Sequence, residues 1–190
     1  MLKKIRSCVF ISGKGSNLSS IIKSSRSYDF PIKVDLIISN NQKALGHKIA
    51  KKYSIPFKFF SSSNQYLFER EALIELRKKK IKFLCLAGFM KILSKNFIRS
   101  FRYKIINIHP SLLPKYKGTN THKRVLKNKE KYSGCTVHFV TSKLDSGKII
   151  LQKRVLISKK ETEISLKEKV LKIEHSVYPK SIISVFKNFI

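Results

Sequence analysis

The stretch RSCVFISGKGSNLSSIIKSS, residues 6–25, decides the fold class. The short apolar run at 6–12 predicts a β-strand, the glycine-containing segment 13–17 predicts a loop, and the spacing of apolar residues over 18–25 predicts a helix. A strand, a glycine loop and a helix in this order are typical of an α/β protein built around a parallel sheet.

The same alternation of strand and helix continues toward the middle of the chain. The run IKFLCLA is apolar throughout, as expected for a strand that is covered on both faces of a sheet. Ser94 precedes a short apolar pattern and is expected to act as a helix N-cap. The predicted strands are 32–39, 56–60, 81–87 and 104–109, and the predicted helices are 43–53, 66–79 and 94–100.

After residue 109 the pattern changes. The strands predicted at 135–141 and 148–157 are joined by SKLDSG, a spacing that favours an antiparallel hairpin. A final helix is expected from Glu161 to about Tyr178, with Pro179 marking a break or a kink. The sequence therefore predicts a single domain over 1–190. Its N-terminal half is parallel and doubly wound, and its C-terminal half carries an antiparallel hairpin.

The net charge of +30 raises the possibility of a nucleic-acid binder, because basic surfaces attract phosphates. However, Lys outnumbers Arg 33 to 8, and the Lys residues are spread along the whole chain. A nucleic-acid reader more often clusters its charge and uses Arg for bidentate contacts. We interpret the charge as a solvated Lys-rich surface and expect no specific nucleic-acid partner.

Cysteine usage and hydropathy indicate a cytoplasmic protein that does not enter a membrane. Cys8, Cys85 and Cys135 are far apart, odd in number and set in apolar stretches, so we expect buried reduced thiols. The absence of a CxxC pair argues against a zinc site. No apolar run approaches the roughly 20 residues that a membrane-spanning helix requires.

The loop GKGSN has the composition of a phosphate-binding turn. Its glycines allow the backbone to approach an anion, and the free N–H groups of the next helix point toward it. Ser16 and Asn17 can either cap that helix or bind the anion. A Walker loop is excluded because GxxxxGK[ST] is absent, and Leu18 stands where a dinucleotide fingerprint requires its third glycine. The loop therefore favours a single phosphate, with a plain tight turn as the alternative.

A second polar group lies at the end of the strand KIINIH. Asn107 and His109 are two residues apart, so their side chains point to the same side of the strand. They stand at its C-terminal end, where open α/β sheets bind their ligands. The chain has three aspartates, Asp29, Asp35 and Asp145. Asp145 lies in the hairpin turn, where the alternatives are an ordinary turn residue and a carboxylate that reaches His109 and orients its ring. His138, on the strand 135–141, is expected to be structural.

Five segments in order resemble the phosphoribosylglycinamide formyltransferases: GKGSNL, LAGFMKIL, NIHPSLLPKYKG, VHFVTSKLDSGKIILQ and IEHSVYP. The resemblance implies a Rossmann-like formyltransferase fold. It also implies transfer of a formyl group from 10-formyltetrahydrofolate to the amine of 5-phosphoribosylglycinamide in purine synthesis, with no metal. The expected partners are these small molecules, and the expected assembly is a monomer or a homodimer.

The resemblance also assigns roles to residues. The substrate amine attacks the formyl carbon, Asn107 and a protonated His109 stabilise the oxyanion, and Asp145 supports His109. The ribonucleotide is expected to bind Gly15, Ser16 and Asn17 through its phosphate and Glu174 at the glycinamide end. The folate is expected to bind Met90, Lys91, Ile92, Leu93, Asn107, Thr141, Ser142, Lys143 and Leu144.

Three positions depart from the pattern of the family. Lys14 stands in place of an Asn, Gln65 in place of a folate-contacting Arg, and Asn120 in place of a His. These departures concern affinity more than chemistry. One alternative is a formyltransferase that acts on initiator methionyl-tRNA, which would require an additional C-terminal RNA-binding domain. The other is a non-catalytic basic nucleic-acid binder, which leaves Asn107, His109 and Asp145 unexplained.

Overall fold

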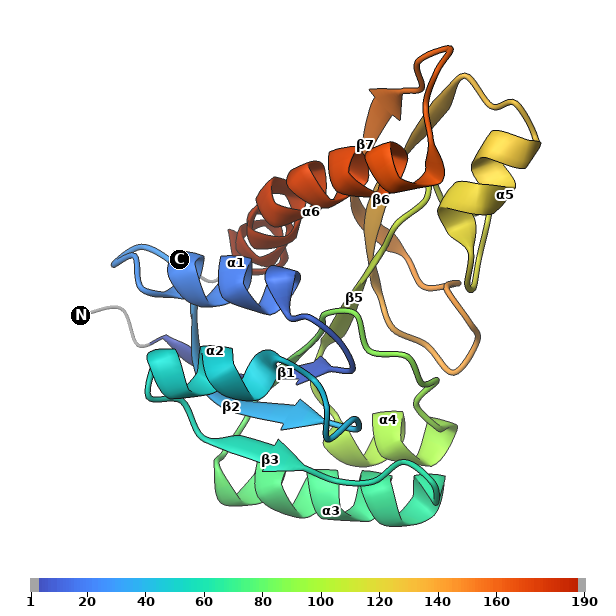
Figure 1. Ribbon diagram of the computed structural model, residues 1–190. Coiled ribbons are helices and arrows are strands. Elements are labelled where there is room, and N and C mark those ends of the chain that lie inside the picture. The colour runs from blue at the N-terminus through green and yellow to red at the C-terminus, as the bar shows by residue number, and fades with distance from the viewer. Residues whose placement is uncertain (1–3, 188–190) are drawn as a thin grey trace.

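The computed structural model describes residues 4–187, so the ends of the predicted domain 1–190 lie outside the described residues (Figure 1). Within them, strands and helices alternate as the sequence pattern predicts. The strands are β1 Ile5–Ile11, β2 Ile32–Ser39, β3 Phe57–Phe59, β4 Phe83–Leu86, β5 Ile105–His109, β6 Tyr132–Phe139 and β7 Ile149–Leu156. The helices are α1 Ser16–Ser25, α2 Gly46–Lys52, α3 Gln65–Lys78, α4 Lys95–Phe101, α5 Thr121–Lys127 and α6 Glu163–Phe186.

The strands form a seven-stranded sheet in the order β3-β2-β1-β4-β5-β6-β7. The first five strands in that order pair in parallel, and β6 and β7 pair antiparallel to their neighbours. This arrangement confirms the predicted α/β fold, with a parallel doubly wound N-terminal half and an antiparallel hairpin in the C-terminal half.

Helices cover both faces of the sheet (Figure 1). On one face, α1 and α6 pack over the strands through residues such as Leu18 and Val170. On the other face, α3 and α4 form a second core in which Phe68 and Phe97 pack against Phe10. Burying each such side chain contributes roughly 1.5–3 kcal/mol. Both faces are therefore apolar, which explains why the central strands carry continuous apolar runs.

The last helix does not break at Pro179, contrary to one reading of the sequence. Proline has no N–H, so the carbonyl four residues earlier, that of His175, loses its helical partner. In the structure the Ser20 hydroxyl of α1 donates to this carbonyl at 2.6 Å. The helix therefore continues to Phe186 because a neighbouring helix satisfies the group that proline leaves unpaired.

Several boundaries also differ from the prediction, and two of them have a clear physical cause. Helix α2 begins at Gly46 rather than at 43, because the Asn41 side chain accepts from the Lys43 N–H and forms a turn before the helix. Strand β6 begins at Tyr132 and includes Gly134, where a Cβ would lie 2.1 Å from the Lys153 carbonyl oxygen. Close approach of the two strands, rather than a turn, is the reason for glycine at this position.

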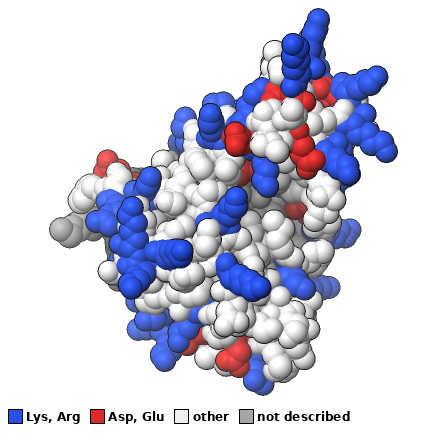
Figure 2. Space-filling model, viewed as in Figure 1, with Lys and Arg blue, Asp and Glu red and all other residues white. Residues whose placement is uncertain are grey.

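Charged side chains are distributed over much of the surface. Figure 2 shows Lys and Arg side chains scattered from one end of the viewed face to the other, rather than gathered in one patch. None of the helices within residues 4–187 has the length and apolar character needed to cross a membrane.

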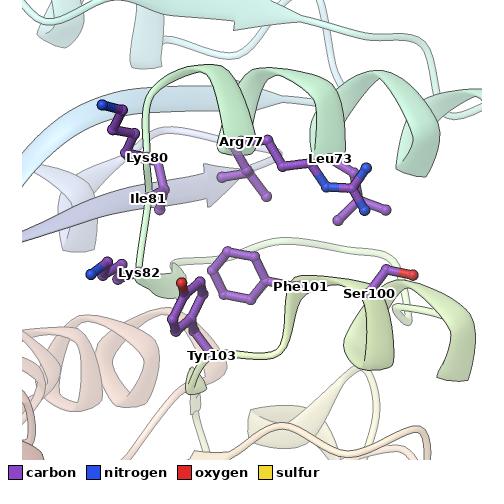
Figure 3. A pocket seen from close by; sticks show the side chains of 9 residues that line it. Leu73, Arg77, Lys80, Ile81, Lys82, Ser100, Phe101 and Tyr103 are labelled. Carbon is purple, nitrogen blue, oxygen red and sulfur yellow. The ribbon is translucent and has the colours of Figure 1, made fainter.

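A cavity of about 310 Å³ lies between α3 and α4 (Figure 3). It is lined by Leu73, Ile81, Phe101 and Tyr103, with basic side chains such as Arg77 at its edge. Residues 80–82 come just before β4, and Tyr103 comes just before β5. The cavity therefore lies at the N-terminal ends of these strands, whereas the polar residues singled out in the sequence lie at their C-terminal ends.

Candidate functional site

Parallel strands bring three separate segments to one edge of the sheet. Strands β1, β4 and β5 are neighbours and run in the same direction, so their C-terminal ends lie together. The Ser12 N–H, just after β1, donates to the Gly88 carbonyl, just after β4, at 3.1 Å. The candidate site is built at this edge, which is where open α/β sheets bind ligands.

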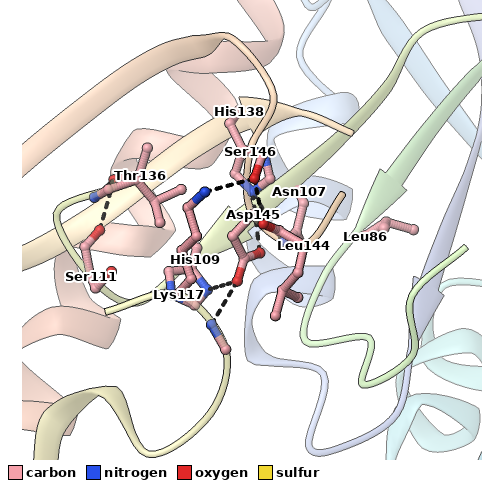
Figure 4. Close-up of polar contacts among 12 residues, drawn as sticks. Leu86, Asn107, His109, Ser111, Lys117, Thr136, His138, Leu144, Asp145 and Ser146 are labelled. Carbon is pink, nitrogen blue, oxygen red and sulfur yellow. Dashed lines mark hydrogen bonds and ion pairs between the residues drawn. The ribbon is translucent and has the colours of Figure 1, made fainter. Parts of the chain in front are cut away.

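The structure brings Asn107, His109 and Asp145 into one polar cluster (Figure 4). Asn107 and His109 come from β5, and Asp145 comes from the turn between β6 and β7. The Asp145 carboxylate lies 3.3 Å from His109 Nδ1. It also accepts from the Gly118 N–H at 2.9 Å. The hairpin therefore carries the carboxylate back to the end of β5, and both side chains of the ion pair are only 7% exposed.

Burial controls the charge of His109. It lowers the pKa of His109 more than the Tyr116 carbonyl and the Asp145 carboxylate raise it, so the net pKa is below the ordinary histidine value. The ring nitrogen Nε2 lies 2.8 Å from the Tyr116 carbonyl oxygen. A neutral imidazole has one N–H and can donate to only one of its two acceptors. Both ring nitrogens therefore face acceptor oxygens, an arrangement that only the protonated ring satisfies, while burial opposes its charge.

Asp145 remains ionised in the same environment. Burial acts to raise its pKa, but the polar contact with His138, the hydrogen bond from the Gly118 N–H and the nearby His109 ring together outweigh that effect. The pKa of Asp145 therefore lies below the ordinary aspartate value. An ionised carboxylate at this distance favours the protonated form of the His109 ring and orients it.

His138 belongs to this cluster, although the sequence favoured a structural role. Its Nε2 lies 3.3 Å from Asn107 Nδ2 and 3.6 Å from Asp145 Oδ1. Its Nδ1 lies 2.8 Å from the Phe139 carbonyl oxygen. Strand pairing sets Asn107 opposite His138 and His109 opposite Thr136. The sequence signal for His138 was its two-residue spacing from Thr136, which matches the spacing of Asn107 and His109. That signal could be used only once the register of β5 against β6 was known.

The glycine loop leaves the start of α1 open. Gly15 is the N-cap with φ 76°, and no side chain caps the helix, so Ser16 and Asn17 do not take the capping role that was one of their two alternatives. A Cβ at Gly15 would lie 2.8 Å from the Ile49 side chain. The first N–H groups of α1 therefore lack intrahelical partners and can bind an anion. Lys14 is exposed in the same loop.

Asn17 and Glu174 connect this loop to α6. Asn17 Nδ2 donates to Glu174 Oε2 at 2.7 Å. Burial raises the pKa of Glu174 to about 7, and the hydrogen bond from Asn17 offsets only part of this effect. Within residues 4–187, Asn17 Oδ1 is buried without a hydrogen-bond partner. The structure thus joins two residues that the sequence assigned separately to the ribonucleotide.

The two segments assigned to folate expose most, but not all, of their apolar side chains. Met90 is 70% exposed and Ile92 is 50% exposed, whereas Leu93 is 2% exposed and packs in the α3–α4 core. The Leu93 side chain therefore faces the core, and the assignment of Leu93 to folate stays a prediction that concerns its backbone. In the segment before Asp145, Leu144 is exposed, and a Cβ added at Gly118 would lie 3.6 Å from its side chain. Exposed apolar side chains on both segments are suited to an apolar ring.

The other two departures from the family pattern lie at helix starts. Asn120 is the N-cap of α5 with φ 55°, and its side chain makes no cap hydrogen bond. Gln65 is the first residue of α3, and its side chain donates to the Ile92 carbonyl at 3.0 Å. Gln65 therefore contacts the Met90–Leu93 segment directly.

Comparison with known proteins identifies the family of the chain. The formyl transferase family matches residues 5–182. The phosphoribosylglycinamide formyltransferase of Haemophilus influenzae is 39% identical over 181 residues, covering 94% of this chain and 84% of that protein. The crystal structure of phosphoribosylglycinamide formyltransferase from Brucella melitensis has a TM-score of 0.91 and 36% identity, covering 97% of this chain and 96% of that chain.

The chain also matches a part of larger proteins. The trifunctional purine biosynthetic protein adenosine-3 of Homo sapiens is 39% identical over 180 residues, which cover 93% of this chain. The chain spans 18% of the length of that relative.

Proposed function

The chain is an enzyme of the formyl transferase family, and we propose that it transfers a formyl group from 10-formyltetrahydrofolate to the amine of 5-phosphoribosylglycinamide. The observation that carries the proposal is the position of the open α1 N-terminus and the Asn107–His109–Asp145 cluster at one edge of the sheet. A phosphate site and a proton-handling site at one edge suit a phosphorylated amine as the acceptor.

The ribonucleotide binds at the α1 end of this edge. Its phosphate accepts from the backbone N–H groups of Gly15, Ser16 and Asn17. Glu174, held by Asn17, contributes a carboxyl group that accepts or donates a hydrogen bond according to its protonation. Folate binds against the segment Met90–Leu93 and the segment 141–144, with its formyl group directed at Asn107.

The chemistry begins with attack of the amine on the formyl carbon. A C–N bond forms, the carbonyl oxygen becomes an oxyanion, and the Asn107 amide and the protonated His109 ring donate to it. Ionised Asp145 supports the charge on His109 and accepts the proton that the attacking amine releases. The oxyanion then reforms the carbonyl, the C–N10 bond breaks, and the proton passes to N10 of the folate.

The charge of the chain is passive in this proposal. Dispersed Lys residues attract anions generally, and binding of nucleic acid is expected to be weak and to disappear with moderate salt. The partners are the two small molecules, the assembly is a monomer or homodimer, and no metal takes part. The three cysteines are free and buried, in keeping with a reducing cytoplasm.

A formyl-transfer assay with 5-phosphoribosylglycinamide and 10-formyltetrahydrofolate tests the proposal. We expect turnover that requires both compounds and is absent with ribosylglycinamide that lacks the phosphate. A parallel reaction with methionyl initiator tRNA distinguishes the alternative acceptor. Formylation of the tRNA but not of the ribonucleotide would refute the proposed substrate.

A further inference from the structure

We propose that Glu69, assisted by Gln65, is a positioning residue that holds the Met90–Leu93 segment in the shape that binds folate. This inference rests on the proposed function for the identity of the ligand. Its structural basis is a buried carboxylate on α3 that the catalytic cluster does not use and that is only 8% exposed.

The Glu69 carboxylate ties the end of the segment to α3. Its Oε1 accepts from the Ser94 N–H at 2.7 Å and from Gln65 Nε2 at 3.0 Å. Its Oε2 accepts from the Ser94 hydroxyl. The Gln65 amide also donates to the Ile92 carbonyl at 3.0 Å. Two side chains of one helix therefore fix the backbone at positions 92 and 94.

The other end of the segment is held from β1. The Ser12 hydroxyl accepts from the Met90 N–H at 2.8 Å and donates to the Asn40 side chain at 2.6 Å. The Met90–Leu93 segment, which Ser12 holds at one end and Glu69 at the other, has no helix or strand of its own. Side-chain hydrogen bonds thus set its shape, while Met90 and Ile92 remain exposed for a ligand.

Pre-ordering of this kind affects ligand affinity more than chemistry. A loop that is already in its bound shape loses less conformational entropy when the ligand arrives. The packing of α3 on α4 does not depend on Glu69, because Phe68 and Phe97 already belong to the apolar core between these helices. Removing the carboxylate should therefore loosen the segment without separating the helices.

Steady-state kinetics of four variants test the proposal. In Glu69→Ala we expect the KM for 10-formyltetrahydrofolate to rise about tenfold, since the two hydrogen bonds that tie Ser94 to the Glu69 side chain are lost. The KM for the ribonucleotide and kcat should stay within about twofold. Gln65→Ala should raise the folate KM about threefold, and Glu69→Gln should recover most of the affinity because an amide can still accept from Ser94. Glu75→Ala, on the same helix outside these contacts, is the matched control.

Amide hydrogen exchange without ligand provides a test that does not depend on activity. Exchange over residues 88–95 should be faster in Glu69→Ala than in the wild type, with little change in the rest of α3. Absence of formyl transfer in the wild type would refute the proposed function. The exchange rates at residues 88–95 would then decide by themselves whether Glu69 orders the segment. Equal folate KM values, or unchanged exchange at 88–95 in both Glu69→Ala and Gln65→Ala, would overturn the positioning role. Gln65 is exposed, so its variant remains informative if Glu69→Ala does not fold.

Discussion

Replacement of Asp145 by Asn tests the proposed mechanism most directly. Asp145 has φ 43°, a left-handed conformation that Asn adopts readily and Ala does not. The Asn side-chain oxygen can still accept from the Gly118 N–H, which is the 2.9 Å contact that fixes the turn. The substitution therefore removes the negative charge and leaves the local structure in place.

The size of the effect follows from the distance between the two groups. With the carboxylate 3.3 Å from His109 Nδ1, the attraction to an imidazolium is at most about 5 kcal/mol at an effective dielectric constant of about 20. Loss of a single preorganised oxyanion donor typically lowers kcat by about 10²–10³. We therefore expect Asp145→Asn to lower kcat by about 10³, with each KM changing less than about threefold.

The assay is steady-state formyl transfer by Asp145→Asn, His109→Ala and the double variant, with circular dichroism and Tm as controls for folding. Residues that act as a unit are non-additive, so the double variant should be little slower than the slower single variant. A folded Asp145→Asn enzyme with kcat within about tenfold of the wild type would show that Asp145 is only a turn residue.

Three further predictions concern the α1 region. Gly15→Val should raise the ribonucleotide KM at least about tenfold, because a Cβ at this positive φ would lie 2.8 Å from the Ile49 side chain. Gly13→Ala is the control, since no atom lies within 4 Å of its added Cβ, and equal ribonucleotide KM values for the two variants would refute the phosphate site. Burial raises the pKa of Glu174 to about 7, so the folded state favours the protonated form and stability is lost as pH rises from about 4.5 to about 7. Glu174→Gln should therefore raise Tm at pH 8 more than at pH 5. An equal Tm shift at the two pH values would contradict this reasoning. Ser20→Ala should lower the free energy of unfolding by about 1 kcal/mol, and by less in a Pro179→Ala background, where residue 179 regains its helical N–H. Urea unfolding of the two single variants and the double variant measures this coupling. Strictly additive changes in the free energy of unfolding would exclude it.

Local patterns were sufficient to predict most of the fold. The expected N-cap at Ser94 is confirmed, because its hydroxyl accepts from the Phe97 N–H. The placement of Asn107 and His109 required only the two-residue period of a strand and the direction of a parallel sheet. These features depend on near neighbours in the chain, and the sequence presents near neighbours directly.

The features that were missed depend on distant residues. The continuous helix through Pro179 requires Ser20, which lies on another helix. The inclusion of His138 in the cluster depends on the register of β5 against β6. The burial of Leu93 depends on how α3 and α4 cover the sheet. In each case a local rule was overridden by a tertiary contact that no sequence window contains.

The contact between Asn17 and Glu174 shows why the antiparallel half matters for the site. The chain leaves the parallel half after β5, adds β6 and β7, and returns through α6 to α1, where Glu174 meets Asn17 across 157 residues. A buried polar atom without a partner costs about 1–3 kcal/mol, and Asn17 Oδ1 is such an atom within residues 4–187. A structural role alone would favour an apolar residue at this position. The free amide oxygen of Asn17 can instead accept a hydrogen bond from the ribonucleotide while the loop donates to its phosphate. This role supports the assignment of Asn17 and Glu174 to the substrate.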